Sequence, residues 1–299
     1  MTDPGGPTNE RQALVFALLS VALWSTVATA FKLGLESLAP VQLLFLGATF
    51  SVIFFCAALF QSGQVVALLA TPYRELLRHA ALGILNPFAY YVILFEAYDR
   101  LPAQIAQPLN YTWAVALAIL AWPILGQRPT RKGLMGMGVS YIGVVVLLSQ
   151  GRLEGFRELD FFAILLMLAS TLIWAIYWLL SVRSRAPALV VMTPGFVLGC
   201  ICVTVVCGLT CGFPELNTEN LALGAWVGLF EMGVTFLLWR TALARSSNAG
   251  RLGQLIFLSP FVSLVLIHHI LGEAVHWTSV VGLVGIVMGL MISQRSVSP

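Results

Sequence analysis

The chain has 299 residues, of which 59% are hydrophobic and only 10% are charged, and its formal net charge is +3. Soluble domains carry about a quarter charged residues, so this composition excludes a soluble globular protein. The mean hydropathy of +0.91 predicts an integral membrane protein whose apolar segments leave no room for a soluble domain.

Ten apolar segments follow one another along the chain, and each is long enough to cross a bilayer as a helix of about 20 residues. Residues 1–11 precede them as a polar cytoplasmic tail. The sequence therefore predicts an all-α integral membrane protein with ten transmembrane helices. In chain order these helices are expected at about residues 12–33, 39–61, 76–98, 102–124, 132–150, 159–180, 188–211, 221–242, 248–271 and 276–293.

Charged residues fall between these segments and predict the orientation of the chain. Twelve of the 16 basic residues lie on the side that holds the N-terminus, and the other side receives Lys32, Arg100, Arg152 and Arg157. Because Lys and Arg are enriched in cytoplasmic loops, we expect both termini in the cytoplasm. The positive charge is thus a signal of topology and indicates no nucleic-acid partner.

The second half of the chain repeats the first at an offset of roughly 146 to 150 residues, as in many transporters. Residues 17–24 are similar to residues 167–174, with Trp24 matching Trp174. Residues 124–126 recur as residues 270–272. The repeat indicates two copies of one five-helix unit.

An odd number of helices in each copy determines how the two copies relate. Five crossings force the second copy to enter the membrane from the opposite side, so we expect inverted repeats over residues 12–150 and 159–293. This plan is frequent in carriers that work by alternating access, and their substrate sites lie near the bilayer midplane between the repeats.

The join between the last two helices of each unit carries the most specific motif. It reads Ile270-Leu271-Gly272-Glu273 in the second half, while Gln127 occupies the position of the Glu in the first. In this motif the unit resembles the EamA unit of the drug/metabolite transporter superfamily, over nearly the whole chain. The resemblance implies a secondary carrier of the bacterial inner membrane that is not an enzyme and needs no cofactor.

Two further segments resemble the aromatic amino acid exporters of that superfamily. Asn110-Tyr111-Thr112-Trp113 is similar to their Asn-Tyr-Leu-Trp-Pro segment, although Ala114 replaces the proline. Trp174-Ala175-Ile176-Tyr177 is similar to their Trp-Ala-Ala-Tyr. The resemblance implies export of aromatic amino acids or similar small amphipathic metabolites, with the lipid bilayer as the other partner.

Polar and aromatic residues concentrate in the first, third, fourth and sixth segments, where a cavity at the repeat interface is expected. Rings there suit a flat apolar group, and a ligand ammonium can lie over a ring face. Trp and Tyr near helix ends instead favour interfacial belts; these are Tyr98, Trp122, Trp226 and Trp277. The predicted substrate-binding residues are Trp24, Asn86, Phe88, Tyr91, Gln107, Asn110, Tyr111, Trp113, Trp174, Tyr177 and Trp178.

Glu231 is the ionisable residue closest to the middle of a predicted membrane helix. Ionisable residues in such positions usually have a function. Glu231 either couples proton movement or holds an ammonium group, and a hydrogen-bonded structural carboxylate is an equally good interpretation. Four of the five cysteines lie between residues 200 and 211. They have no His or carboxylate neighbour in sequence, so we assign them to helix packing and expect no metal site.

Three other functions stay open. An exchanger of phosphorylated sugars or nucleotide sugars in the same superfamily requires a basic residue in the cavity, and only Arg251 lies near a suitable position. An integral membrane enzyme is disfavoured because the common catalytic motifs are missing. A channel requires a selectivity element, either polar side chains arranged in a ring or backbone carbonyls. None can be recognised in the sequence.

Overall fold

The computed structural model describes residues 9–125, 130–149, 160–181, 184, 186–246, 252 and 254–294. Every regular element in these residues is a helix. Gln127, Arg152, Arg157 and Arg251 lie outside them. In the first half the elements are α1 (Glu10–Ser25), α2 (Val27–Ser37), α3 (Pro40–Gln61), α4 (Val65–Leu69), α5 (Tyr73–Gly83), η1 (Ile84–Ala89), α6 (Tyr90–Arg100), α7 (Ala103–Asn110), α8 (Trp113–Leu125) and α9 (Arg131–Ser149).

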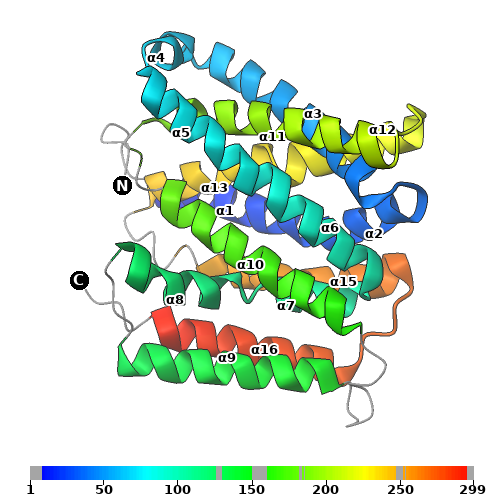
Figure 1. Cartoon of the computed structure of the whole chain (residues 1–299). Coiled ribbons are helices and arrows are strands. Elements are labelled where there is room, and N and C mark those ends of the chain that lie inside the picture. The colour runs from blue at the N-terminus through cyan, green and yellow to red at the C-terminus, as the bar shows by residue number, and fades with distance from the viewer. Residues whose placement is uncertain are drawn as a thin grey trace.

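The second half follows a similar order of elements. These are α10 (Phe161–Ser181), α11 (Ala188–Thr210), α12 (Thr218–Trp226), η3 (Val227–Glu231), α13 (Val234–Arg245), η4 (Gln254–Leu258), α15 (Ser259–Leu271) and α16 (Trp277–Gln294). In both halves a π-helix, η1 or η3, interrupts the third predicted segment. Figure 1 shows the helices running across the molecule in roughly one direction.

Seven helices of the described chain are long and apolar enough to cross a membrane, and two shorter apolar helices follow at residues 255–271 and 277–292. The fourth predicted segment is divided into α7 and α8 by a break at Tyr111 and Thr112. The prediction of an all-helical membrane protein is confirmed at this level.

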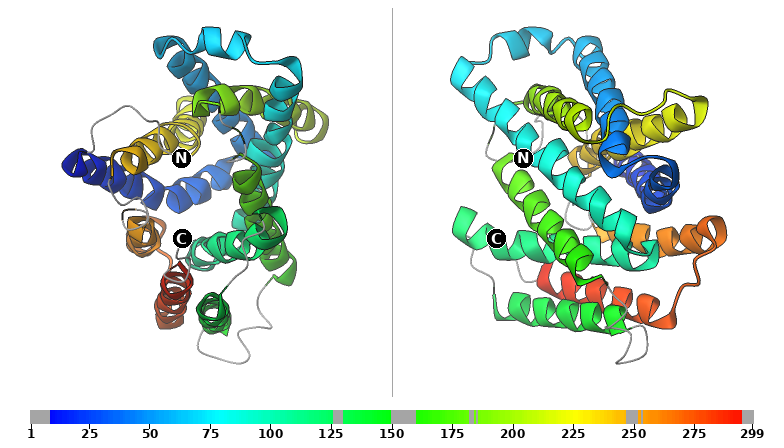
Figure 2. Two further views of the ribbon diagram at one scale, coloured as in Figure 1. Left: turned by 90° about the vertical axis from the view of Figure 1, so that its left-hand side faces the viewer. Right: turned by 45° about the vertical axis from the view of Figure 1, so that its right-hand side comes forward.

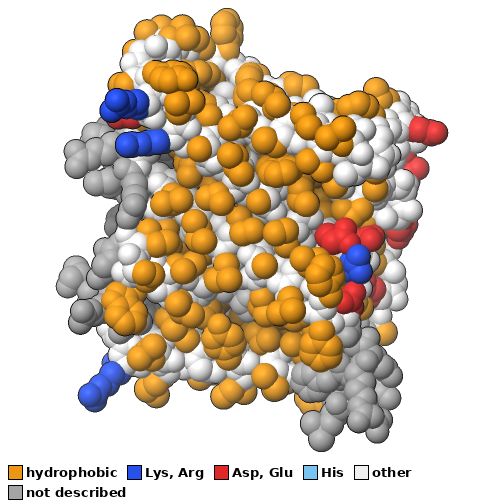
Figure 3. All heavy atoms as spheres, viewed as in Figure 1, with side chains coloured by type: hydrophobic (Ala, Val, Ile, Leu, Met, Phe, Trp, Pro, Cys, Tyr) orange, Lys and Arg blue, Asp and Glu red, His pale blue; other side chains and the backbone are white. Residues whose placement is uncertain are grey.

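The outer surface explains why the chain requires lipid. Large apolar side chains are exposed along many helices, among them Phe60, Leu134, Ile142 and Leu165. Figure 3 shows them across the whole face of the molecule, with Lys and Arg at one edge and mostly Asp and Glu at the opposite edge. α1 begins and α16 ends at the basic edge (Figure 1). A band of exposed apolar side chains between two charged edges is stable only in an apolar solvent.

The break in the third segment follows from its sequence. A proline disfavours helical backbone in the residue before it and donates no hydrogen bond of its own. Asn86 precedes Pro87 and has extended backbone, with φ −146° and ψ 120°. Both residues are buried, so the interruption faces protein, as it must inside a membrane.

Helices of the first half pack against helices of the second half in matched pairs. In the first half α1 packs against α13 of the second, while α10 of the second packs against α6 of the first. In the same way α5 packs against α11, and α12 packs against α3. Much of the core therefore lies between the halves.

The helices α9 and α16 form a separate close pair at one end of the molecule (Figure 2). Glycines permit this contact, because a Cβ on Gly143 would lie 2.6 Å from the Gly282 carbonyl oxygen and one on Gly289 would overlap the Gly136 carbonyl oxygen. Ser140 Oγ adds a 3.0 Å hydrogen bond to the Ile286 carbonyl. Small residues play this role in many membrane helix pairs.

The sequence motif at residues 270–273 connects the halves at the acidic edge. Gly272 ends α15 with a left-handed φ of 67°, which glycine adopts without steric cost. The next residue, Glu273, then accepts hydrogen bonds from the backbone N–H of Ala103 at 2.9 Å and of Gln104 at 3.1 Å. Its carboxylate thus caps the start of α7 in the other half, where free N–H groups and the helix dipole favour negative charge.

Gln104 completes this connection from the side of α7. Its amide nitrogen donates to the Ala274 carbonyl at 2.9 Å, and its amide oxygen accepts from the His276 backbone N–H at 2.9 Å and from Ser279 Oγ at 3.1 Å. The segment between α15 and α16 is therefore held against α7 by groups from both halves.

We expect Gly143→Ala to destabilise the protein by about 1–3 kcal/mol, the usual cost of overpacking, because the new methyl group meets backbone atoms of α16. Gly138→Ala in the same helix is the matched control, since its Cβ would have no neighbour within 4 Å. Thermal unfolding in detergent measures both. Equal melting temperatures would contradict the close α9–α16 contact.

We expect Glu273→Ala to cost about 0.5–2 kcal/mol of stability, the usual range for a lost helix N-cap. Glu215→Ala serves as the control, because Glu215 is exposed in the turn before α12. Denaturant unfolding of the purified protein, together with amide hydrogen exchange at Ala103 and Gln104, measures the loss. Unchanged exchange at both amides would show that the carboxylate does not cap α7.

Candidate functional site

An aromatic cluster lies between the halves, and Phe236 of α13 is at its centre. The Phe236 ring lies 5.9 Å from Trp24 and 5.8 Å from both Trp174 and Trp178, measured between centroids. It stacks on Trp178 with an interplanar angle of 15° and meets the other two edge-on. Trp24 and Trp174, which match in the repeat, therefore contact the same ring.

The cluster continues onto α6 through two tyrosines. The Tyr90 ring lies 4.6 Å from Trp174 and 4.6 Å from Tyr91. Tyr177 joins from α10, with its centroid 6.1 Å from Trp174 and 5.9 Å from Trp178. Rings from α1, α6, α10 and α13 thus form one continuous aromatic surface at van der Waals separations.

Glu231 lies next to two rings of this cluster, those of Tyr91 and Trp24, and is 8% exposed. Its Oε1 accepts a 3.0 Å hydrogen bond from the Tyr91 hydroxyl, and Trp24 lies beside the same carboxylate. Its other oxygen, Oε2, is buried without a hydrogen-bond partner. The carboxylate thus belongs to the second half of the chain and accepts its hydrogen bond from the first half.

Two asparagines bring further polar atoms to the same place. Asn110 Nδ2 donates to the Tyr90 hydroxyl at 3.4 Å, and its Oδ1 is buried without a partner. Asn86 is 1% exposed and lies beside Tyr177, yet neither atom of its amide forms a hydrogen bond of normal geometry. Buried polar groups without partners are uncommon in proteins and call for an explanation.

Gln107 and Tyr98 form a second polar contact toward the acidic edge. The Tyr98 hydroxyl donates to Gln107 Oε1 at 2.5 Å, and both side chains are buried. The prediction that Tyr98 lies in an interfacial belt is therefore wrong. Tyr98 does lie near the end of α6, but α2 and α7 cover that end of the helix. The Phe31 and Tyr98 ring centroids are 5.2 Å apart.

The other predicted residues lie at different distances from the cluster. Tyr111 is buried at the break between α7 and α8 and lies beside Ser259. Phe88 and Trp113 are half-buried against the hydrophobic core, and within the described residues neither ring pairs with the cluster. Trp122, Trp226 and Trp277 are exposed, as expected for belt residues.

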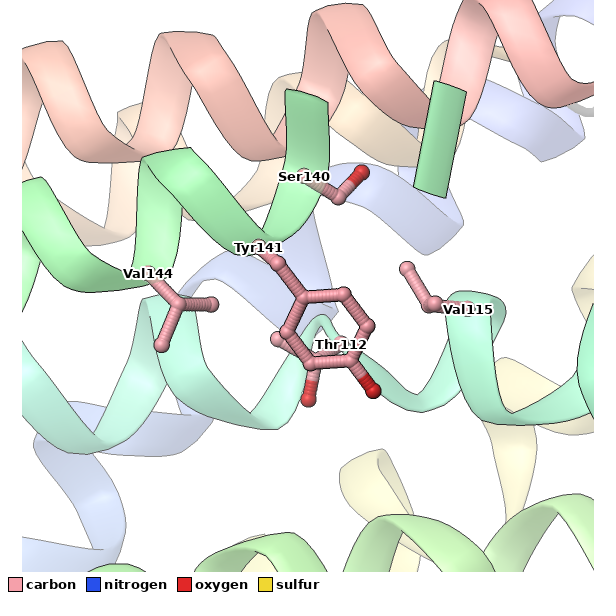
Figure 4. A pocket seen from close by; sticks show the side chains of 5 residues that line it. All are labelled: Thr112, Val115, Ser140, Tyr141 and Val144. Atoms are coloured by element: carbon pink, nitrogen blue, oxygen red, sulfur yellow. The ribbon is translucent and has the colours of Figure 1, made fainter. Parts of the chain in front are cut away.

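A small hollow between α8 and α9 lies away from the cluster (Figure 4). Its volume is about 10 Å³, and Thr112, Val115, Ser140, Tyr141 and Val144 line it. This volume is about the minimum for one water molecule. None of the predicted substrate-binding residues lines it, so it is a packing defect and not a substrate site.

Phe236 is absent from the predicted site residues although it connects several of them. The repeat contains the missing signal for Phe236. If Asn86 is aligned with Glu231, then Tyr91 and Phe236 each follow five residues later. Both lie in the helix just after a π-helix, and such interruptions are frequent at functional sites.

The site brings aromatic rings and polar groups together in one place. Within the described residues no group of three His, Cys, Asp or Glu side chains is placed to hold a metal ion. The Lys32 ammonium donates to the Tyr98 and Leu101 carbonyls at 2.9 and 3.2 Å. Glu231 has no basic partner among the described side chains.

The lipid-facing surface, the polar residues buried between the halves and the interrupted helices are together typical of a multi-pass membrane transporter. The sequence pattern of the EamA-like transporter family matches this chain twice, over residues 11–149 and 161–294. The chain belongs to that family.

Two of three relatives of this chain carry transporter names. An uncharacterized transporter of Archaeoglobus fulgidus is 23% identical over 95% of this chain and 98% of its own length. The uncharacterized transporter YyaM of Bacillus subtilis is 24% identical over 72% of both chains, and the protein PecM of Dickeya dadantii is 27% identical over 75% of both. A solved crystal structure shares the fold, with a TM-score of 0.67 and a sequence identity of 22%. The match covers 97% of this chain and 100% of the other.

We expect Tyr98→Phe to destabilise the protein by about 1–3 kcal/mol, because it leaves the buried Gln107 oxygen without its donor. Tyr141→Phe is the matched control, since Tyr141 is exposed on α9. Thermal unfolding in detergent compares the two variants with the parent protein. If both melt alike, Tyr98 is not the hydrogen-bonded core residue described here.

Proposed function

We propose that this protein is a secondary carrier that exports aromatic amino acids or similar small amphipathic metabolites by alternating access around the aromatic cluster. The observation that carries the proposal is the meeting of four rings, Trp24, Trp174, Trp178 and Phe236, from both halves at one place. Ring–ring contacts favour a flat ligand by about 0.5–1.5 kcal/mol each beyond burial.

Alternating access requires two bodies that move relative to each other, and we infer ten helices in two inverted repeats. Three observations support this inference. The family pattern matches once in each half, the helix pairs between the halves are exchanged symmetrically, and a π-helix interrupts the third segment of each half. In such carriers the substrate site lies where interrupted helices meet.

We further propose that both termini lie in the cytoplasm and that the membrane is the bacterial inner membrane. The distribution of charge supports the orientation, because α1, α5 and α9 begin at one edge of the molecule (Figure 1). Near the starts of these helices lie the exposed residues Arg11, Arg74, Arg78, Arg131 and Lys132. Basic residues stay on the cytoplasmic side during insertion.

An exchanger of phosphorylated sugars or nucleotide sugars is the weaker alternative. It requires a cation to pair with phosphate, and the ammonium of Lys32 is engaged by two backbone carbonyls. The aromatic cluster instead presents a carboxylate and amide groups, which repel or poorly bind a phosphate. The geometry therefore favours an organic ligand with a ring.

The test is counterflow in proteoliposomes with labelled phenylalanine, tyrosine and tryptophan. We expect saturable exchange, and we expect Trp174→Ala to lower transport efficiency by about tenfold, a loss of about 1.4 kcal/mol. Trp113→Ala should have a smaller effect because its ring lies outside the cluster. Trp277→Ala, at a side chain 62% exposed, is the control and should transport as the parent does.

Two results would contradict the proposal. One is that none of the three labelled amino acids moves through a folded, reconstituted protein. The other is that Trp174→Ala and Trp113→Ala both leave transport unchanged, in which case the aromatic cluster is packing and the substrate binds elsewhere. Exchange that does not saturate would instead indicate a channel.

A further inference from the structure

Four buried side-chain atoms of Glu231, Asn86 and Asn110 have no hydrogen-bond partner, and three of them are acceptors. Glu231 Oε2, Asn86 Oδ1 and Asn110 Oδ1 are all buried and have no hydrogen-bond partner, and Asn86 Nδ2 is the one donor in the same condition among these three side chains. Asn110 Nδ2 is already used toward the Tyr90 hydroxyl. A ligand that brings several donors would satisfy this set, since buried acceptors lose stability when left unpaired.

The charge at the cluster points to a cationic donor. Glu231 is buried, and among the described side chains none that is basic pairs with it. Burying a carboxylate costs free energy unless a positive charge or several hydrogen-bond donors lie next to it. Tyr91 supplies one hydrogen bond, to Oε1, so Oε2 remains for the ligand.

The rings around the carboxylate strengthen the same preference. Trp24 lies beside Glu231, and the Tyr91 hydroxyl donates to it. The Tyr90 ring lies 4.6 Å from both the Tyr91 and the Trp174 rings, measured between centroids. A cation close to Trp or Tyr faces is attracted by their π electrons, most strongly where water is excluded. Carboxylate, amide oxygens and ring faces therefore all select an ammonium group.

We propose that the cluster is a binding site for protonated arylalkyl amines, with the ammonium at Glu231 and the ring among Trp174, Trp178 and Phe236. The inference rests on the proposed carrier function and narrows its substrate class: the amine is required and a carboxylate on the ligand is not. The carboxylate of an amino acid would face Glu231, and among the Glu231, Asn86 and Asn110 side chains it would find one unused donor, the Asn86 amide nitrogen.

Three compounds with the same indole ring separate these requirements: tryptamine has only the amine, tryptophan has amine and carboxylate, and indole-3-propionate has only the carboxylate. Each is measured as a labelled substrate for counterflow in proteoliposomes of the full chain. We expect the KM of tryptamine to be at least about tenfold below that of tryptophan, in line with one charged hydrogen bond. Indole-3-propionate should not be transported.

Glu231→Gln tests the assigned carboxylate, because it keeps the size of the side chain and removes its charge. We expect it to raise the KM of tryptamine at least about tenfold while indole-3-propionate is transported no worse than by the parent protein. Glu96→Gln is the matched control: it removes a half-exposed carboxylate paired with Arg100 at the acidic edge and should leave the KM of tryptamine unchanged. If Glu231→Gln fails to fold, the three-compound comparison on the parent protein decides the question.

The outcomes distinguish the two proposals. Transport of tryptophan or indole-3-propionate in preference to tryptamine overturns the amine assignment and leaves the carrier proposal standing. Equal transport of tryptamine by Glu231→Gln and the parent protein also overturns it. Failure of all three compounds in the folded parent protein, together with phenylalanine and tyrosine, overturns the carrier proposal itself.

Discussion

A bilayer core offers no hydrogen-bond partner to a backbone N–H or carbonyl, and the arrangement of this protein depends on that constraint. Helix interruptions must then be enclosed by protein. Three of those in the described chain are at Asn86-Pro87, at Tyr111-Thr112 and next to Glu231, and these side chains are all buried. The same positions carry the polar groups of the candidate site. Irregular backbone and chemistry thus coincide because both need the space between the halves.

The aromatic cluster depends on both halves in the same way. Trp174 and Trp178 come from α10 of the second half, yet their neighbours include Tyr90 of α6 in the first. Tyr91 of the first half holds Glu231 of the second. Relative movement of the halves would therefore alter the shape of the cluster and the surroundings of the carboxylate together. This is the physical requirement for a site whose affinity changes between two states.

The helices and several site residues were predictable from the sequence because membrane insertion imposes a simple hydropathy rule. Trp24 and Trp174 were found through the repeat, which reports three-dimensional symmetry without a structure. Tyr98 was assigned wrongly, since position along a helix does not reveal which neighbours cover its end. Phe236 was missed because phenylalanine is common in lipid-facing helices, and only the packing of α13 against α1 makes it central.

The capping of α7 by Glu273 bears on how such a doubled chain holds together. The first half begins its fourth segment with backbone N–H groups that are satisfied by a carboxylate from the second half. A first half made as a separate polypeptide would expose those groups and lose its partner rings at once. Two such fragments would have to assemble before either could be inserted as a complete fold. The duplicated chain turns that encounter between two molecules into an intramolecular contact, whose effective concentration is set by the linker.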